Sequence, residues 1–302
     1  MRNPFDRILG PGGVVVLDGG LATELERRGA DLKDPLWSAK GLVEDPDAIR
    51  GVHEAYFDAG ADVAISASYQ ATFEGLAGRG IERADAARLM RRSVELAREA
   101  ASGDRVVAAS VGPYGAMLGN GAEYTGDYDK DEDELVGFHV PRIETLAEAG
   151  PDVFALETIP SFVEAGALVR ALERVPEIPA WVSFSCRDGG HVCDGTPIAS
   201  AVEVVAASSS VVAVGVNCTS PLHVERLVET ISATTGKPVV CYPNRGSFWD
   251  PMRKAWTDPP RQDARPPLRP LAWKEAGASM IGGCCGTTPD DIVAIAAALG
   301  RA

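Results

Sequence analysis

The run Val211-Val-Ala-Val-Gly-Val-Asn-Cys218 is the clearest of several short, β-branched segments in this chain. It is apolar at nearly every position and lacks the polar alternation of a strand with one face in water. Continuous valine-rich runs of this kind are typical of parallel strands that are buried on both faces. The sequence therefore predicts a parallel sheet that is covered by helices.

Seven similar runs lie on either side of this one, and segments with helical spacing separate them. In one such segment Met90, Val94, Ala97 and Ala101 recur at intervals that place them on one helix face. Strand followed by helix, eight times over, is the pattern of a (β/α)₈ TIM barrel, and we predict a single domain over residues 1–302. An open doubly wound sheet is the alternative. The predicted strands are Val14–Asp18, Val63–Ser68, Val106–Val111, Val153–Glu157, Trp181–Ser185, Val211–Asn217, Val239–Tyr242 and Ser279–Gly283.

The composition limits the classes of partner. The 302 residues include 29 Lys and Arg against 43 Asp and Glu, a net charge of −14, so a nucleic acid partner is not expected. No apolar run approaches the roughly 20 residues that span a bilayer, and the first residues lack the features of a signal peptide. We expect a cytoplasmic protein with no membrane partner, and the sequence predicts no particular oligomeric state.

Two long segments interrupt the repeat, residues 115–132 and 246–270, and both follow predicted strands. Active sites of TIM barrels form at the C-terminal ends of the strands, and long loops there are often functional. Aromatic residues in or beside these segments could line a pocket, although loop packing is their commoner use. They are Tyr114, Tyr124, Tyr128, Phe248, Trp249 and Trp256. Pro141 is expected either to begin the helix predicted over 135–149 or to kink it.

Several polar residues fall at the ends of predicted strands and are expected to converge. Three of them are cysteines, Cys218 in one turn and the adjacent pair Cys284 and Cys285 in another. Zinc binds cysteine sulfur readily, and three protein ligands leave a fourth position open for water or substrate. The sequence therefore predicts a catalytic Zn²⁺ site. The alternative is three inert thiols, since cysteine is often a small buried hydrophobe.

Two carboxylates, Asp18 and Glu157, also fall at predicted strand ends. Paired carboxylates on a barrel are typical of many glycoside hydrolases, but the cysteines do not fit that chemistry. Asp18 could equally be a turn residue that is bonded to its own backbone. Burial of Glu157 at the end of an apolar strand is costly without a partner, and the cationic amino group of a substrate would be one.

Eight motifs, which together span nearly the whole chain, resemble those of the homocysteine S-methyltransferase family of zinc-dependent barrel enzymes. The paired cysteines lie in the last of them, within the glycine-rich run Gly282–Thr287. The other motifs are Asp18–Glu26, Leu36–Ala39, Ser68–Thr72, Ser110–Gly115, Gly121–Tyr128, Glu157–Pro160 and Gly215–Cys218.

The resemblance implies an enzyme that methylates homocysteine to methionine. By this resemblance Cys218, Cys284 and Cys285 are the zinc ligands, while Asp18, Gly19 and Glu157 hold the amino acid portion of homocysteine. We also predict that Asn217 and Tyr69 bind substrate. The motifs are most similar to the branch of the family that uses a small cationic sulfonium donor, S-methylmethionine or S-adenosylmethionine, rather than betaine. Arg245 departs from this pattern, because a small polar residue is expected there.

Two rival functions are compatible with the cysteines. One is methylation of another thiol or a selenol, such as selenocysteine, by the same chemistry. The other is a non-catalytic protein that binds thiols through zinc. The predicted acceptor-binding carboxylates and donor-side motifs favour the enzyme over the second rival.

Overall fold

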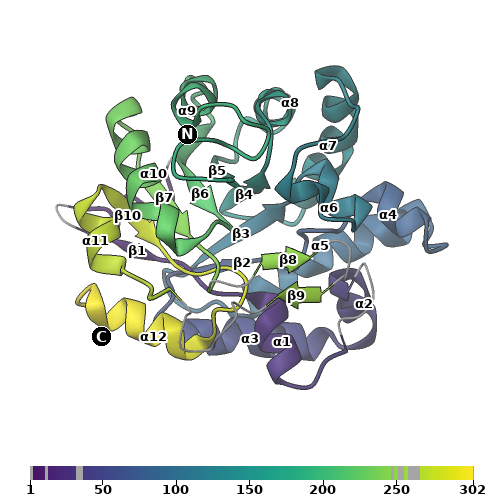
Figure 1. Ribbon diagram of the computed structural model, residues 1–302. Coiled ribbons are helices and arrows are strands. Elements are labelled where there is room, and N and C mark those ends of the chain that lie inside the picture. Colours follow the sequence, from purple (N-terminus) through teal and green to yellow (C-terminus); the bar gives the residue numbers. More distant parts are fainter. Residues whose placement is uncertain are drawn as a thin grey trace.

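The structure is a computed structural model that describes residues 3–10, 13–31, 37–245, 248–250, 255–257 and 266–301. For residues 37–40, 248–250 and 255–257 it describes the backbone alone. Figure 1 shows the strands at the centre of the molecule with the helices around them. In the part of the chain that the structure describes, no helix combines the length and the apolar character needed to cross a membrane.

Eight parallel strands form one sheet in the order β1-β10-β7-β6-β5-β4-β3-β2. A parallel bridge between Leu17 and Val63 joins the two edges, so the sheet closes on itself. This closure confirms the TIM barrel and excludes the open doubly wound sheet. The strands are β1 Val15–Val16, β2 Val63–Ile65, β3 Val106–Val111, β4 Val153–Ile159, β5 Ala180–Phe184, β6 Val211–Asn217, β7 Val239–Tyr242 and β10 Ala278–Ile281.

The helices follow the strands along the chain and cover the outside of the barrel (Figure 1). Helix α5 illustrates how they do so, because it buries Met90, Val94 and Ala97 on the face that was predicted. The prediction was wrong for Ala101, which caps the C-terminus of the helix in an extended conformation. The helices are α1 Leu21–Arg27, α2 Trp37–Glu44, α3 Pro46–Asp58, α4 Phe73–Ala77, α5 Arg83–Ala100, α6 Tyr114–Leu118, the 3₁₀ turn η1 Ala122–Tyr124, α7 Glu132–Ala147, α8 Phe162–Leu172, α9 Ile198–Ala206, α10 Pro221–Thr234, α11 Pro270–Glu275 and α12 Pro289–Ala298.

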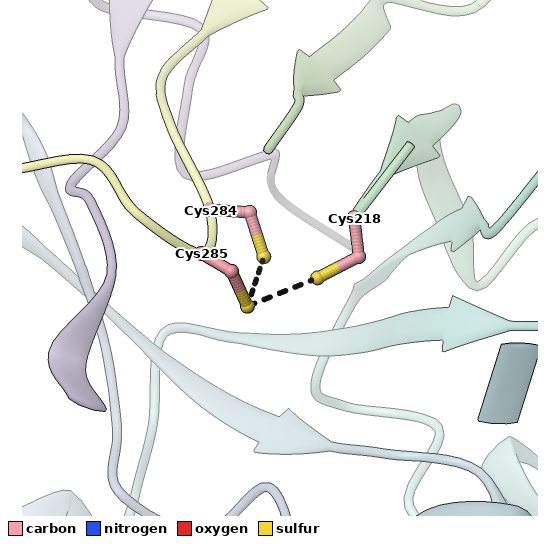
Figure 2. Close-up of side chains that lie close together, drawn as sticks. All are labelled: Cys218, Cys284 and Cys285. Carbon is pink, nitrogen blue, oxygen red and sulfur yellow. Dashed lines mark hydrogen bonds between the residues drawn. The ribbon is translucent and has the colours of Figure 1, made fainter. Parts of the chain in front are cut away.

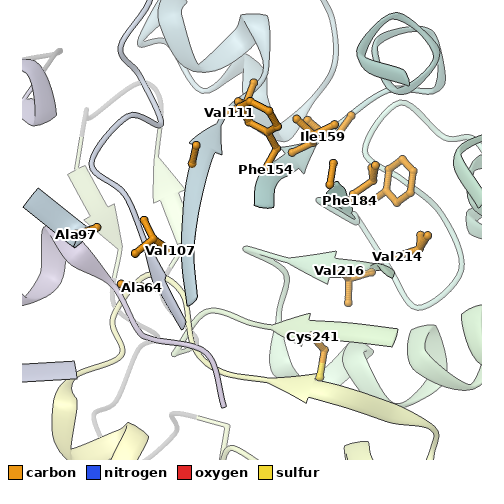
Figure 3. Close-up of a cluster of buried hydrophobic side chains, with 14 of the residues drawn as sticks. Ala64, Ala97, Val107, Val111, Phe154, Ile159, Phe184, Val214, Val216 and Cys241 are labelled. Carbon is orange, nitrogen blue, oxygen red and sulfur yellow. The ribbon is translucent and has the colours of Figure 1, made fainter. Parts of the chain in front are cut away.

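Alternate residues of each strand belong to two separate apolar layers, because successive side chains of a strand point to opposite faces. Val107, Phe154 and Val214 belong to the layer between strands and helices, part of which Figure 3 draws. Their neighbours Ala108 and Ala155 fill the barrel interior. The same alternation places Ser110 and Glu157, two positions further along β3 and β4, on the interior face.

The barrel interior is filled rather than open. Phe5, from the segment before β1, is fully buried there, and its ring centroid lies 6.1 Å from that of Trp181 at the start of β5. Val106 and Val153, which begin β3 and β4, belong to the same cluster. This packing occupies the N-terminal ends of the strands, so polar groups of the interior gather at the C-terminal ends.

Helix α7 contradicts one of the two alternatives for Pro141, that it begins the helix, and the kink stays a prediction. The helix begins well before the proline, where the Asp131 side chain accepts from the Glu134 N–H and Glu134 bonds back to the Asp131 N–H in a capping box. Pro141 therefore lies inside the helix, and its carbonyl accepts a hydrogen bond from the Thr145 hydroxyl at 2.7 Å. A local cap determines where this helix begins, not the proline.

The two long segments contain more regular structure than the sequence indicated. Segment 115–132 carries most of α6 and all of η1. Segment 246–270 contains an antiparallel pair, β8 Phe248–Asp250 and β9 Ala255–Thr257. The side chains of Phe248, Trp249 and Trp256 lie outside the described part of the structure, so a role for them in lining a pocket stays a prediction.

Candidate active site

The predicted site residues lie at the C-terminal ends of the strands, which meet at one end of the barrel. They belong to five strands or to the turns that follow them. Asp18 and Gly19 follow β1, Tyr69 follows β2, Glu157 is in β4, Asn217 and Cys218 end or follow β6, and Cys284 and Cys285 follow β10.

The sulfur atoms of three cysteines converge, as Figure 2 shows. The Sγ atom of Cys285 lies 3.6 Å from that of Cys218 and 3.9 Å from that of Cys284. All three sulfur atoms lie within 4.8 Å of one another. Tetrahedral zinc with Zn–S bonds of about 2.3 Å separates its sulfur ligands by about 3.8 Å. The spacing therefore fits three ligands of one metal ion.

Backbone hydrogen bonds hold the turn that carries the adjacent cysteines. The Cys284 N–H donates to the Pro243 carbonyl at 2.9 Å, and the Cys285 carbonyl accepts from the Arg245 N–H at 2.8 Å. Gly286 has a φ of +78°, a conformation that glycine adopts without steric cost, and its N–H donates to the Thr23 hydroxyl at 2.9 Å. The turn that carries the two thiols is thus held by bonds to the turn after β7 and to helix α1.

Arg245, the residue that departs from the family pattern, supports this turn. Its Nε atom lies 3.1 Å from a carboxylate oxygen of Asp291 in α12. Its Cβ atom is also the nearest neighbour of Gly286, where an added Cβ would lie only 2.9 Å away. The guanidinium therefore pairs with a helix of the outer layer.

Thr158 and Cys218 are the non-glycine residues with positive φ in the described part of the chain, at +60° and +45°. Such conformations are costly, most of all for a β-branched residue, and they persist where surrounding contacts enforce them. The Asn217 amide provides those contacts. Its Oδ1 accepts from the Thr158 N–H at 2.7 Å, and its Nδ2 donates to the Thr158 hydroxyl at 2.8 Å. Asn217 thereby ties the end of β6 to the end of β4.

Replacing Asn217 by Ala is expected to lower the free energy of unfolding by about 2–3 kcal/mol, because it removes two buried hydrogen bonds and leaves the Thr158 N–H without a partner. Relaxation of Thr158 should also lower kcat/KM, since Thr158 adjoins Glu157. Urea denaturation and steady-state kinetics measure the two effects. Asn244→Ala is the matched control, because the buried Asn244 Oδ1 has no partner to lose. Equal destabilisation of the two variants would contradict this role for Asn217.

Hydrogen bonds among the three thiols shift their pKa values in opposite directions. Hydrogen bonding with Cys284 and Cys285 lowers the pKa of Cys218 well below its ordinary value. The same bonds with Cys218 raise the pKa values of Cys284 and Cys285. One thiolate is therefore favoured at the expense of two thiols. A divalent ion would stabilise all three thiolates, which is the form that binds metal.

The turn after β1 is packed tightly against its neighbours. Asp18 accepts a hydrogen bond from the Ile65 N–H at 2.7 Å, and burial raises the pKa of its carboxyl well above its ordinary value. A Cβ atom at Gly19 would lie 2.7 Å from the Tyr56 ring and 2.9 Å from the Thr287 hydroxyl, so only glycine fits there. Asp18 therefore supports the closure of the barrel between β1 and β2, besides its predicted contact with substrate.

Glu157 is buried on the interior face with two hydroxyl partners. It accepts hydrogen bonds from the Ser110 hydroxyl and, at 3.1 Å, from the Tyr242 hydroxyl. Tyr242 is itself held by the Trp181 indole N–H at 3.0 Å and by Ser183 at 2.6 Å. Burial raises the pKa of Glu157 to about 7. A cation placed beside this carboxylate would restore its ionised form.

Tyr69 lies on the turn after β2 and is held by a buried arginine of α7. Arg142 donates hydrogen bonds to the carbonyls of Ser68 at 2.8 Å, Tyr69 at 2.5 Å and Gly112 at 2.9 Å. The Tyr69 ring packs against Gly112, where an added Cβ would lie 2.6 Å from it. Arg142 thus fixes the turns after β2 and β3 relative to each other.

Several residues of this site were missed as single residues in the sequence analysis. Ser110 and Tyr242 end predicted strands, so the strand-end argument applied to hydroxyl groups would have found them. Glu123 lies inside one of the motifs and is buried. Thr158 also lies inside a motif, Glu157–Pro160, but its role depends on tertiary contacts. Arg142 lies in none of the motifs.

Comparison with known proteins identifies the family. The family model described as homocysteine S-methyltransferase matches residues 15–299. The chain belongs to the homocysteine S-methyltransferase family. The match includes all eight strands of the barrel and every predicted site residue. It removes the glycoside hydrolase alternative for the paired carboxylates.

Individual relatives of the homocysteine S-methyltransferase family match over nearly their full length. The homocysteine S-methyltransferase YbgG of Bacillus subtilis (strain 168) is 47% identical, with 98% of this chain and 97% of that protein covered. The homocysteine S-methyltransferase of Escherichia coli (strain K12) is 44% identical, with 98% of each covered. The crystal structure of the homocysteine methyltransferase MmuM from Escherichia coli in its metallated form superposes with a TM-score of 0.87, at 43% identity and with 98% of this chain and 100% of that chain covered.

Proposed function

We propose that this enzyme transfers a methyl group from a small cationic sulfonium compound to the sulfur of L-homocysteine, which gives methionine. The observation that carries the proposal is the convergence of three thiols with the buried carboxylates Asp18 and Glu157 at one end of a homocysteine S-methyltransferase barrel. We take residues 1–302 as one domain, and we place it in the cytoplasm because its thiols need a reducing compartment.

We assign the metal as Zn²⁺, held by Cys218, Cys284 and Cys285. The spacing of the sulfur atoms fits this ion, and zinc is both thiophilic and redox-inert. Zinc bound at the three cysteines would supply a Lewis acid that lowers the pKa of the homocysteine thiol, so that the acceptor reacts as a thiolate without a separate general base.

Binding and orientation of homocysteine are the tasks of the chain's own residues. We assign its ammonium group to Glu157 and Asp18, whose buried carboxylates are stabilised in the ionised form by a cation. We also assign Gly19 to the amino acid portion of homocysteine, as the resemblance implies. Asn217 acts through the conformation of Thr158, and Tyr69 borders the site from the turn after β2. Fixing the acceptor in this way removes much of the entropic cost of the reaction.

The transfer itself is a displacement at carbon. The homocysteine sulfur attacks the methyl carbon, and the bond from that carbon to the donor sulfur breaks. The electron pair of the broken bond stays on the donor sulfur, which becomes a neutral sulfide. No proton moves in this step, so the protein need only align the two sulfur atoms and exclude water. We propose S-methylmethionine or S-adenosylmethionine as the donor.

One observation favours selenocysteine as a second candidate acceptor. The protein named selenocysteine Se-methyltransferase from Brassica oleracea var. italica is 45% identical to this chain, with 94% of this chain and 88% of that protein covered. A selenol is chemically similar to a thiol, so the same cysteine cluster would accept it. Homocysteine is favoured, because the other relatives compared above are named for it. Their names also favour an enzyme over a non-catalytic thiol-binding protein.

A competition assay tests the reaction and names the donor. Zinc-loaded protein is incubated with homocysteine and equal amounts of S-methylmethionine, S-adenosylmethionine and betaine, each with a distinguishable methyl label. We expect labelled methionine from a sulfonium donor and none from betaine, by mass spectrometry. Selenocysteine in place of homocysteine tests the second acceptor. Bound zinc without labelled methionine would refute the proposed function.

A further inference from the structure

Glu123, on the turn η1, is a buried carboxylate without a complete set of partners. The residue is 9% exposed, and its Oε2 atom is buried with no hydrogen-bond partner. Burial raises the pKa of Glu123 to about 7. A carboxylate in this position is costly, and the cost is recovered only if a cation or a donor group joins it. The site therefore calls for a positively charged ligand.

The segment that carries Glu123 is fixed over the ends of β4 and β5. The Ser185 hydroxyl, just after β5, donates to the Glu123 carbonyl at 3.0 Å and lies 3.4 Å from the Thr158 carbonyl. Gly115 packs on the same turn, where an added Cβ would lie 2.5 Å from the Glu123 nitrogen. Gly126, with a φ of +69°, leaves 3.0 Å between its Cβ position and the Pro160 carbonyl. The carboxylate is thus held at the same end of the barrel as the cysteines.

A second buried glutamate, Glu164, holds the segment around η1 in place, so Glu123 is not needed for that purpose. Glu164 in α8 accepts hydrogen bonds from the Tyr114 N–H at 2.6 Å and from the Tyr128 hydroxyl, and it pairs with His139 Nε2 at 2.9 Å. These bonds anchor both ends of the segment around η1. Glu164 therefore stabilises the segment, whereas the Oε2 atom of Glu123 makes no hydrogen bond with the protein.

Two tyrosines link Glu123 to the cysteine cluster. Burial raises the pKa of Tyr69 well above its ordinary value, and the charges of Glu123 and Cys218 raise it further. Burial and the charges of Cys218, Cys285 and Glu123 do the same to Tyr124. Both rings therefore lie within range of the carboxylate and of the sulfur atoms. This proximity is compatible with a cationic ligand that lies close to the cysteines.

We propose that Glu123 binds the methyl donor, because its carboxylate is the counter-charge of the donor's sulfonium. The inference rests on the proposed function and adds a residue to it. The carboxylate neutralises the positive sulfur in the ground state. The sulfide product, which is neutral, loses this attraction and leaves.

Binding of S-methylmethionine to zinc-loaded protein without homocysteine tests the proposal, because no methyl transfer occurs under these conditions. Glu123→Gln should raise the dissociation constant for S-methylmethionine, measured by calorimetry, by about 30-fold or more, since one partner of a buried charge pair is lost. Glu123→Asp should retain part of the affinity. Asp127→Asn removes the same charge from an exposed position of the same segment, and it should leave the affinity unchanged.

Methionine serves as the control ligand, because it lacks only the methyl group and charge on sulfur. It should bind the wild type and Glu123→Gln equally, which also shows that the variant is folded. Equal affinity of both proteins for S-methylmethionine would overturn the role of Glu123 and leave the proposed reaction intact. Failure of the wild type to bind any sulfonium compound would overturn the proposed donor class, and the role of Glu123 with it.

Discussion

Cys285→Ala is expected to lose its zinc and its activity together. Cys285 is the central member of the cluster, with sulfur distances of 3.6 Å to Cys218 and 3.9 Å to Cys284. Loss of an outer-shell partner alone costs about 10–100-fold in metal affinity, so loss of a ligand should cost more than about 100-fold. Zinc content after dialysis, by elemental mass spectrometry, and methionine formation measure the two losses.

The fold should survive this change, because the backbone bonds around Cys285 do not involve its sulfur. Circular dichroism checks this expectation. Cys193→Ala is the matched control, since Cys193 is a free cysteine at the end of the loop after β5 and is not part of the cluster. It should keep a full complement of zinc. Normal zinc content in Cys285→Ala would contradict the assignment of Cys285 as a ligand.

The strands could be predicted from sequence because most of them are buried on both faces. Strands β3, β6 and β7 begin and end at the predicted residues. In these strands every position must be apolar or small, so the run of residue types itself marks the boundaries. The pair β8 and β9 was not predicted, since its short strands lie in a segment rich in proline and lack an apolar run. Helix α7 shows the same limit, because its start depends on the Asp131 side chain and not on the more conspicuous Pro141.

The cysteines of the site could be predicted because their chemistry is rare and their positions follow strands. The partners of Glu157 were missed although they lie near strand ends, because serine and tyrosine are common and their importance depends on which strands are neighbours. Thr158 is an extreme case. A β-branched residue disfavours a φ of +60°, so local preference predicts against the observed backbone. Only the tertiary bonds from Asn217 explain it, and such conflicts between local and tertiary preference are expected at functional sites.

Glu157→Gln is expected to raise the KM for homocysteine by about 10- to 100-fold at pH 8, while zinc stays bound, because a charged partner of the ammonium group is lost. The pH dependence should also change. The pKa of Glu157 is raised to about 7, so its carboxyl becomes neutral as the pH falls below 7. In the wild type the KM for homocysteine should therefore rise as the pH falls from 8 to 6. Glutamine does not titrate, so the variant should lack this component.

Ser110→Ala distinguishes Glu157 from other titrating groups of the site. The hydrogen bond from Ser110 lowers the pKa of Glu157, so its removal should move the midpoint of the KM profile to higher pH. The wild type, Glu157→Gln and Ser110→Ala all contain the same three thiols, so titration of the thiols affects them equally. Zinc content measured at each pH separates loss of metal from loss of acceptor binding. A KM of Glu157→Gln equal to that of the wild type at pH 8 would assign Glu157 a structural role. An unshifted midpoint in Ser110→Ala would assign the titration to another group.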